Sequence, residues 1–161
     1  MGLTMIVLAW LVLLGLMAFY FDDWLGEQTN PNQTPSSHLN GKMIEVTLLP
    51  NRQHHYVVDG KINGQTVTFM LDTGATDVVV PAPVAHQLGL SKERSVTAYT
   101  ANGKVAVYTT MINTLEIGDI HLTSVPASIN PAMSEPVVLL GMSALRQIEF
   151  SQRGDMLILR Q

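Results

Sequence analysis

The stretch "FMLDTGATDVVVP", residues 69–81, places one carboxylate, Asp72, between two apolar runs. In the preceding residues 65–71, "QTVTFML", apolar and polar side chains alternate with a period of two. This period predicts a strand that runs up to Asp72 and ends there. Burial of an unpaired carboxylate is costly, so an acid at this position needs a chemical reason. We therefore take Asp72 as the candidate catalytic residue.

The three residues after Asp72 suit a tight turn around a reacting group. Gly74 supplies backbone freedom and has no Cβ to block a close approach by substrate or by a second chain. Thr73 offers a hydroxyl and an N–H beside the acid, and Ala75 keeps the turn small. A carboxylate held by turn N–H groups can act as a general base on water.

The rest of the chain after residue 41 has the pattern of an all-β protein. Short β-type runs are separated by turn signals such as Asp59-Gly60, Asn63-Gly64 and Arg153-Gly154. We predict strands at 43–49, 54–59, 65–71, 77–80, 94–100, 104–117, 120–129, 136–140 and 156–160. Short helices are predicted at 82–89 and 142–147. These elements indicate one barrel-like β domain over residues 42–161.

The N-terminal stretch is different in kind. Residues 3–21 contain nineteen residues without a charge, and at about 1.5 Å per residue a helix of this length crosses roughly 30 Å of hydrocarbon. We predict a membrane anchor over residues 1–24, with a cleaved signal peptide as the alternative. The acidic residues after it favour an inside N-terminus. Residues 25–41 are polar and rich in Asn, Pro, Ser and Thr, which predicts a linker that leaves the domain free to reorient.

Composition excludes several kinds of chemistry. The chain has no cysteine, so disulfides, thiol nucleophiles and zinc–thiolate sites are absent. The formal net charge is −4 and no cluster of Lys and Arg is present, so nucleic acid is not an expected partner. His54 and His55 are adjacent in a predicted strand and would point to opposite faces. We expect no metal and no cofactor.

A single carboxylate is half of what acid–base hydrolysis of an amide requires. A second carboxyl group must lie close enough to share a proton, so that one acts as base and the other as acid. The sequence contains one Asp-Thr-Gly, and its other aspartates lie in turns, near the predicted anchor, or too near Asp72 in the chain to face it. A two-fold symmetric homodimer solves this problem, because it places the same residue of both subunits opposite itself.

"LDTGATDVVV", followed about sixty residues later by "PVVLLGMSAL", resembles a retropepsin-type aspartic protease, specifically the membrane-anchored bacterial members of that clan. The resemblance implies a retropepsin-like β-barrel protomer with one or two short helices, and a homodimer that holds the catalytic water between two copies of Asp72. It also implies that the Thr73 hydroxyl braces the two loops across the dimer axis. Gly74 would contact substrate through its backbone, and Gly141 would lie beneath the catalytic loop.

The same resemblance implies a flap that closes over substrate. Its best match is the hairpin at residues 96–110, with Tyr99, Ala101, Asn102 and Gly103 at or near its tip. Viral members of the family carry an Arg after the second glycine, paired with an acid four residues beyond the catalytic Asp. Met142 and Thr76 occupy these places here, so that ion pair is absent and the local packing must differ.

The sequence therefore predicts an aspartic endopeptidase that acts on protein or peptide substrates as a homodimer. It would be a single-pass membrane protein, held through residues 3–21 in a bacterial inner membrane with its C-terminal domain in the periplasm. Two alternatives remain at this point. One is a non-catalytic dimeric β-module that binds extended peptides by strand addition at the membrane, and the other is a membrane scaffold.

Overall fold

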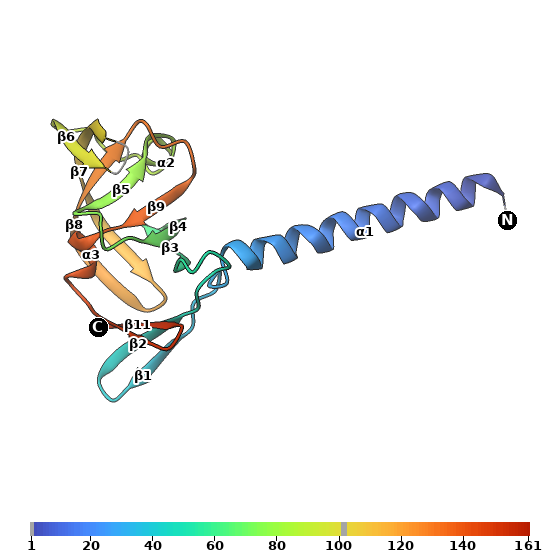
Figure 1. The fold of residues 1–161 in the computed structure, drawn as a ribbon, viewed down its shortest axis with the longest axis horizontal. Helices are drawn as coiled ribbons and strands as arrows, with labels where there is room; N and C mark the ends of the chain where they lie inside the picture. Colours follow the sequence, from blue (N-terminus) through green and yellow to red (C-terminus); the bar gives the residue numbers. More distant parts are fainter. Residues whose placement is uncertain (1, 101–102) are drawn as a thin grey trace.

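The computed structural model describes residues 2–100 and 103–161, which form one long helix and a β domain (Figure 1). Helix α1 (Leu3–Thr29) projects from the domain, and its side chains in the apolar part are exposed. This helix is long enough and apolar enough to cross a membrane. A signal sequence would have the same properties.

The larger of two sheets has seven strands in the order β3-β4-β9-β5-β8-β7-β6. Their bounds are β3 (Val57–Ile62), β4 (Gln65–Leu71), β5 (Val78–Pro81), β6 (Ser95–Thr100), β7 (Gly103–Ile117), β8 (Ile120–Asn130) and β9 (Val137–Leu140). Strand β3 also pairs with β7, which curls the sheet back on itself. Two of the pairings, β4–β9 and β5–β8, are parallel, whereas the other pairings are antiparallel.

The smaller sheet has four strands in the order β1-β2-β11-β10. Its strands are β1 (Ser37–Asn40), β2 (Met43–Leu48), β10 (Glu149–Arg153) and β11 (Met156–Arg160). Figure 1 shows this sheet beside the base of the larger one, with the C-terminus at its end. Side chains of both sheets share one apolar core, in which Val46, Phe69, Leu115 and Leu159 are fully buried.

Two short helices, α2 (Ala82–Gln87) and α3 (Met142–Leu145), complete the domain. The predicted all-β class with short helices is confirmed. Alternation of apolar and polar residues located most strands within one to three residues of their observed bounds, because each strand buries one face against the core.

Two predicted elements differ from the structure, and two observed strands were not predicted. Asp59 and Gly60 lie inside β3 rather than in a turn, and the strand predicted at 54–59 starts at Val57. A Cβ on Gly60 would lie 2.9 Å from the Phe69 ring and against the backbone carbonyl of Glu116. Gly60 therefore allows β3 to approach the β7 backbone and the Phe69 ring closely, and it does not form a turn. Strands β1 and β10 were not predicted.

The segment 25–41 differs most from its prediction as a freely moving polar linker. Helix α1 continues to Thr29, and residues 37–40 form β1, which pairs with β2 in the register Ser37↔Val46 to Asn40↔Met43. Asn30 and Asn32 are buried, with 8% and 6% exposure. Their side chains are not solvated as in a tether, because they form hydrogen bonds with groups inside the domain.

Candidate active site

Asp72 stands at the carboxyl end of β4, where the chain leaves the sheet. Its N–H donates to the carbonyl of Leu140 on the parallel neighbour β9, over 3.1 Å. Its Oδ1 accepts the N–H of Gly74 at 2.9 Å, and its carbonyl accepts the N–H of Ala75 at 3.2 Å. Asp72 is half-buried, and these backbone hydrogen bonds hold it in a tight turn. Thr73 and Gly74 beside it are exposed.

Gly141 lies directly under this turn. A Cβ on Gly141 would stand 2.8 Å from the carbonyl oxygen of Ala75 and would overlap the backbone of Asp77. The next residue, Met142, donates its N–H to the Ala75 carbonyl at 2.8 Å. A side chain at position 141 would push the 72–77 loop away from β9, so glycine is required for this close approach.

Ser143 is a supporting residue that the sequence reasoning missed. Its N–H donates to the Thr76 carbonyl at 2.9 Å, and its Oγ accepts the N–H of Val78 at 2.9 Å. The same hydroxyl donates to the carbonyl of Pro126 on β8, at 2.7 Å. Ser143 therefore holds the 76–78 end of the loop through hydrogen bonds. It lies next to Met142 and Thr76, the positions at which viral members of the family carry an ion pair. Its only sequence signal is a Ser two residues after the glycine of "VVLLG".

Two of the four predicted flap residues, Tyr99 and Gly103, lie in the hairpin formed by β6 and β7. Tyr99 is at the end of β6 and is 79% exposed, and Gly103 begins β7, with the Nζ of Lys104 5.3 Å from the centre of the Tyr99 ring. Ala101 and Asn102 lie outside the described residues. Strands β6 and β7 pair antiparallel along this hairpin, from Ser95↔Tyr108 to Thr100↔Gly103.

A cavity of about 300 Å³ opens beside the turn that contains Asp72 and Thr73. Leu71 and Thr73 line one side of it, and Phe150, Ser151 and Gln152 of β10 line another. All five residues of β10 are exposed. This strand pairs with β11 and forms one edge of the smaller sheet. Within residues 2–100 and 103–161, no group of three or more His, Asp and Glu side chains is placed to hold a metal ion.

The strand-end Asp72, its Thr-Gly turn and Gly141 beneath it resemble the framework of a retropepsin-type aspartic protease. The family described as gag-polyprotein putative aspartyl protease matches residues 58–147, which is more than half of the chain and includes both Asp72 and Gly141. The chain belongs to this family.

Two curated bacterial proteins are similar to this chain. An uncharacterized protein from the cobV 5′ region of Sinorhizobium is 30% identical over 72% of this chain, and uncharacterized protein RP867 of Rickettsia prowazekii is 28% identical over 78%. The matched regions cover 52% and 55% of those proteins, so the chain spans about half the length of these curated relatives.

The crystal structure of a retropepsin-like aspartic protease from Rickettsia conorii is 25% identical to this chain. It superposes with a TM-score of 0.60 and covers 79% of this chain and 94% of that one. This likeness confirms the predicted retropepsin-like fold, and membership of the family suggests a peptidase.

Proposed function

We propose that the protein is an aspartic endopeptidase in which Asp72 of two identical chains activates the hydrolytic water. The observation that carries this proposal is the framework around Asp72, with its Oδ1 bound by the Gly74 N–H and the loop seated on Gly141. The turn is exposed at Thr73 and Gly74, so an extended peptide has access to the carboxylate.

In this mechanism the two Asp72 carboxyl groups share one proton. The ionised group takes a proton from water, while the protonated group gives its proton to the carbonyl oxygen of the scissile peptide bond. The resulting tetrahedral intermediate is not covalently attached to the enzyme. Activity requires one proton on the pair, so we expect a bell-shaped pH profile with an acidic to mildly acidic optimum.

The edge of the smaller sheet supports a homodimer. Strand β10 is exposed along its whole length, and Phe150 is 41% exposed on it. An unpaired sheet edge is a ready template for pairing with another chain. A homodimer that uses this edge could have its two-fold axis beside the cavity that Thr73 and Ser151 line. The second Asp72 would then approach the first.

Helix α1 supports a membrane location. We propose that it spans a bacterial inner membrane once and holds the domain on the periplasmic side. Trp24 follows the uncharged stretch and is suited to the interfacial region. An anchor would also favour dimer formation, because it raises the local concentration of the chains.

The test is cleavage of an unfolded protein by the full-length chain in detergent micelles, across an acidic pH series. Asp72→Asn replaces both carboxyl groups of the pair with amides, so neither the base nor the acid remains. We expect activity to fall by about 10²- to 10⁴-fold while the thermal unfolding curve stays unchanged. A transition-state mimic of aspartic proteases should inhibit the wild type. Full activity in the variant would reject Asp72 as the catalytic residue. Peptide binding without cleavage by the wild type would support a binding module instead.

A further inference from the structure

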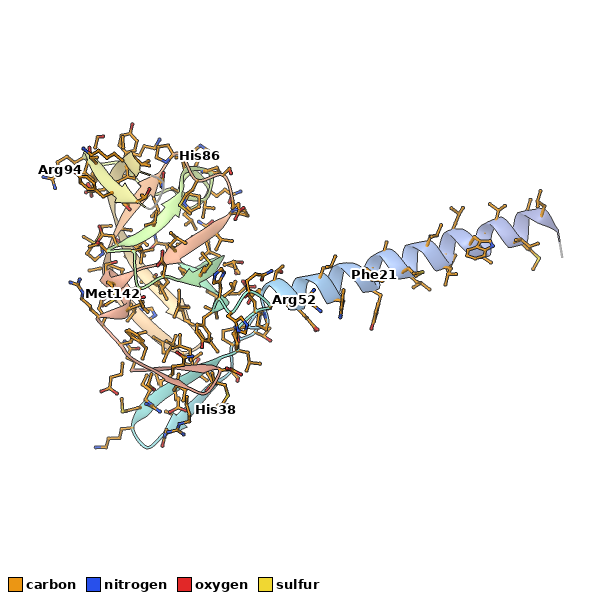
Figure 2. All side chains as sticks on the ribbon, viewed as in Figure 1. Phe21, His38, Arg52, His86, Arg94 and Met142 are labelled. Carbon is orange, nitrogen blue, oxygen red and sulfur yellow. The ribbon has the colours of Figure 1, made fainter. Side chains whose placement is uncertain are left out.

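The end of helix α1 is fastened to the domain by side-chain amides. Asn30 ends the helix, with its N–H donating to the Gly26 carbonyl at 2.9 Å. Its Nδ2 donates to Oδ1 of Asp59 on β3 at 2.7 Å. Asn51 adds a further link, since its Nδ2 donates to the Thr29 carbonyl at 3.1 Å. Figure 2 shows the neighbouring Arg52 at this junction between helix and domain.

Asn32 inserts more deeply and behaves as part of the sheet. Its Nδ2 donates to the carbonyls of Leu49 and Val57, at 2.8 and 2.6 Å, and its Oδ1 accepts the Leu49 N–H at 2.8 Å. Its own backbone forms a parallel bridge with Val58. Every hydrogen-bonding group of this buried side chain has a partner, and such satisfied networks rigidify the structure around them.

Asp59 links the two asparagines. Its Oδ1 accepts from both Asn30 Nδ2 and Thr68 Oγ1, each at 2.7 Å, and its N–H donates to the Asn32 carbonyl at 3.1 Å. Asn30 in turn accepts the Asn32 N–H on its Oδ1, at 3.0 Å. We call Asn30, Asn32 and Asp59 the asparagine clamp.

The clamp is one strand away from the catalytic strand. Asn32 bonds the carbonyl of Val57, which pairs with Met70 on β4, and the N–H of Leu71 donates to the Tyr56 carbonyl at 3.0 Å. Asp72 follows Leu71. With strands about 4.8 Å apart and a rise of about 3.3 Å per residue, Asp72 lies roughly 10 to 15 Å from Asn32.

The same connection fixes how far the catalytic turn stands from a membrane. The uncharged stretch ends at Phe21, which we place at the hydrocarbon boundary. From Phe21 to Thr29 the helix rises about 12 Å, at about 1.5 Å per residue. Three further residues to Asn32 add at most about 10 Å, so Asp72 stands within about 40 Å of the hydrocarbon boundary. Met142, which bonds the catalytic loop through Ala75, lies on the side of the domain away from the helix (Figure 2). The turn is therefore farther from the membrane than the clamp is.

A clamped domain also constrains the homodimer. Two helices that are each rigidly joined to their own domain enter the same bilayer from one side only when the two-fold axis is nearly normal to it. Both copies of Asp72 then stand at the same height. A flexible linker would impose no such condition, because each domain could tilt independently of its helix.

We propose that the asparagine clamp makes anchor and protease domain one rigid unit, and that its substrates are chains held at the membrane. This inference rests on the proposed function. The scissile bond would have to lie in a band between the level of the clamp, about 12 Å, and about 40 Å from the hydrocarbon boundary. Segments close to the membrane-spanning helix of another protein meet this condition, whereas sites held far above the bilayer do not.

The test places the full-length enzyme in lipid vesicles with single-pass substrates. Each substrate carries one cleavable sequence, known to be cut in solution, on a polyproline spacer of two, eight or thirty residues. At about 3.1 Å per residue these spacers hold the site about 6, 25 or 90 Å from the membrane. We expect the eight-residue spacer to be cut at least about tenfold faster than either of the others. Equal rates on all three would overturn the proposal.

A matched pair of insertions tests the clamp. Thirty Gly/Ser residues between Thr29 and Asn30 leave the Asn32 contacts intact but free the domain, with a mean reach of about 30 Å and a larger extended length. We expect the rate ratio of the eight- to the thirty-residue spacer to fall below about threefold. The same insertion at the exposed β1–β2 turn, between Gly41 and Lys42, should keep the wild-type ratio. An unchanged ratio in the first variant would reject the clamp.

An independent measurement separates this inference from the proposed function. The chain has no cysteine, so Ser134→Cys provides a unique label on an exposed loop. Energy transfer from this label to headgroup acceptors should give a narrow distance distribution in the otherwise wild-type chain and a broad one after the Thr29–Asn30 insertion. A broad distribution in both would reject the clamp. A narrow one without cleavage of any substrate or of soluble unfolded protein would reject the protease and its substrate class together.

Discussion

The Asp72 loop (residues 72–77) and the junction of α1 with the domain are both held against the larger sheet, but by opposite means. At the loop, the absence of a side chain at Gly141 allows backbone groups of residues 72–77 and 140–143 to meet directly. At the junction, the buried amide of Asn32 stands in for a missing backbone partner. Direct backbone contact fixes the Asp72 loop closely, while the Asn32 amide joins the segment after α1 to Leu49 and Val57 through its side chain.

The largest effect is expected where contact is closest. Gly141→Ala would place a methyl group 2.8 Å from the Ala75 carbonyl and against the Asp77 backbone. Backbone cannot yield as a flexible side chain can, so we expect a loss of about 3 kcal/mol or more in the free energy of unfolding. Cleavage activity should fall even under conditions where the variant is folded. Denaturant unfolding and an activity assay measure both.

Gly26→Ala is the control for that substitution. Gly26 lies in α1, where the nearest atom to a new Cβ is the flexible end of Gln33, at 3.4 Å. Alanine favours a helix over glycine by about 1 kcal/mol, so this variant should be neutral or slightly more stable. Equal effects at the two positions would contradict the special role of Gly141.

Asn32→Ala probes the junction. It leaves the Leu49 N–H and the Leu49 and Val57 carbonyls without the side-chain partner seen here. Unsatisfied buried groups cost about 1–3 kcal/mol each, partly relieved by water, so we expect a loss of about 2–3 kcal/mol in unfolding free energy.

Asn40→Ala is the matched control for Asn32→Ala. Asn40 is exposed and makes one long hydrogen bond, 3.4 Å, to Glu45. Its loss should change stability by less than about 0.5 kcal/mol. If chemical denaturation ranks the two asparagine variants equally, residues 30–32 are a solvated linker and the contrast with the loop is wrong.

The smallest effect is expected in the smaller sheet and depends on pH. The hydrogen bond from Arg160 Nε at 2.8 Å, aided by one from Asn40, lowers the pKa of Glu45 below its ordinary value of 4.5. A lowered pKa in the folded state stabilises the protein above the ordinary value, and this contribution disappears as the pH falls through the lowered one. Glu45→Gln should therefore lower the melting temperature slightly at neutral pH, and the difference should vanish in acid. A difference that grows in acid would contradict the ion pair.

The two regions also differ in how far the sequence could predict them. Asp72, Gly74 and Gly141 were recognisable because the loop depends on residue types at fixed spacing, and strands such as 65–71 follow a period of two. Asn30 and Asn32 were read as a linker, since asparagine beside proline and serine is usual in solvated segments. Their partners, Leu49, Val57 and Asp59, lie 17 to 29 residues away, and composition carries no information on such contacts.

Ser143 and β10 were missed for related reasons. A serine after "LLGM" has no periodic signal, and its role depends on Val78 and Pro126, which are brought to it by the sheet. Strand β10, "EFSQR", buries no residue, so it lacks the alternation by which strands are recognised. The pairing with β11 places it, and that pairing is tertiary information.

The most direct test of the shared catalytic site mixes wild-type chains with Asp72→Asn chains, unfolded and refolded together so that dimers form at random. When both aspartates are needed, activity follows the square of the wild-type fraction, and an equal mixture should keep about one quarter of the wild-type activity. The measurement is the cleavage rate at constant total protein across mixing ratios. A linear decline, with about one half of the activity in the equal mixture, would show that each chain works alone and would contradict the account.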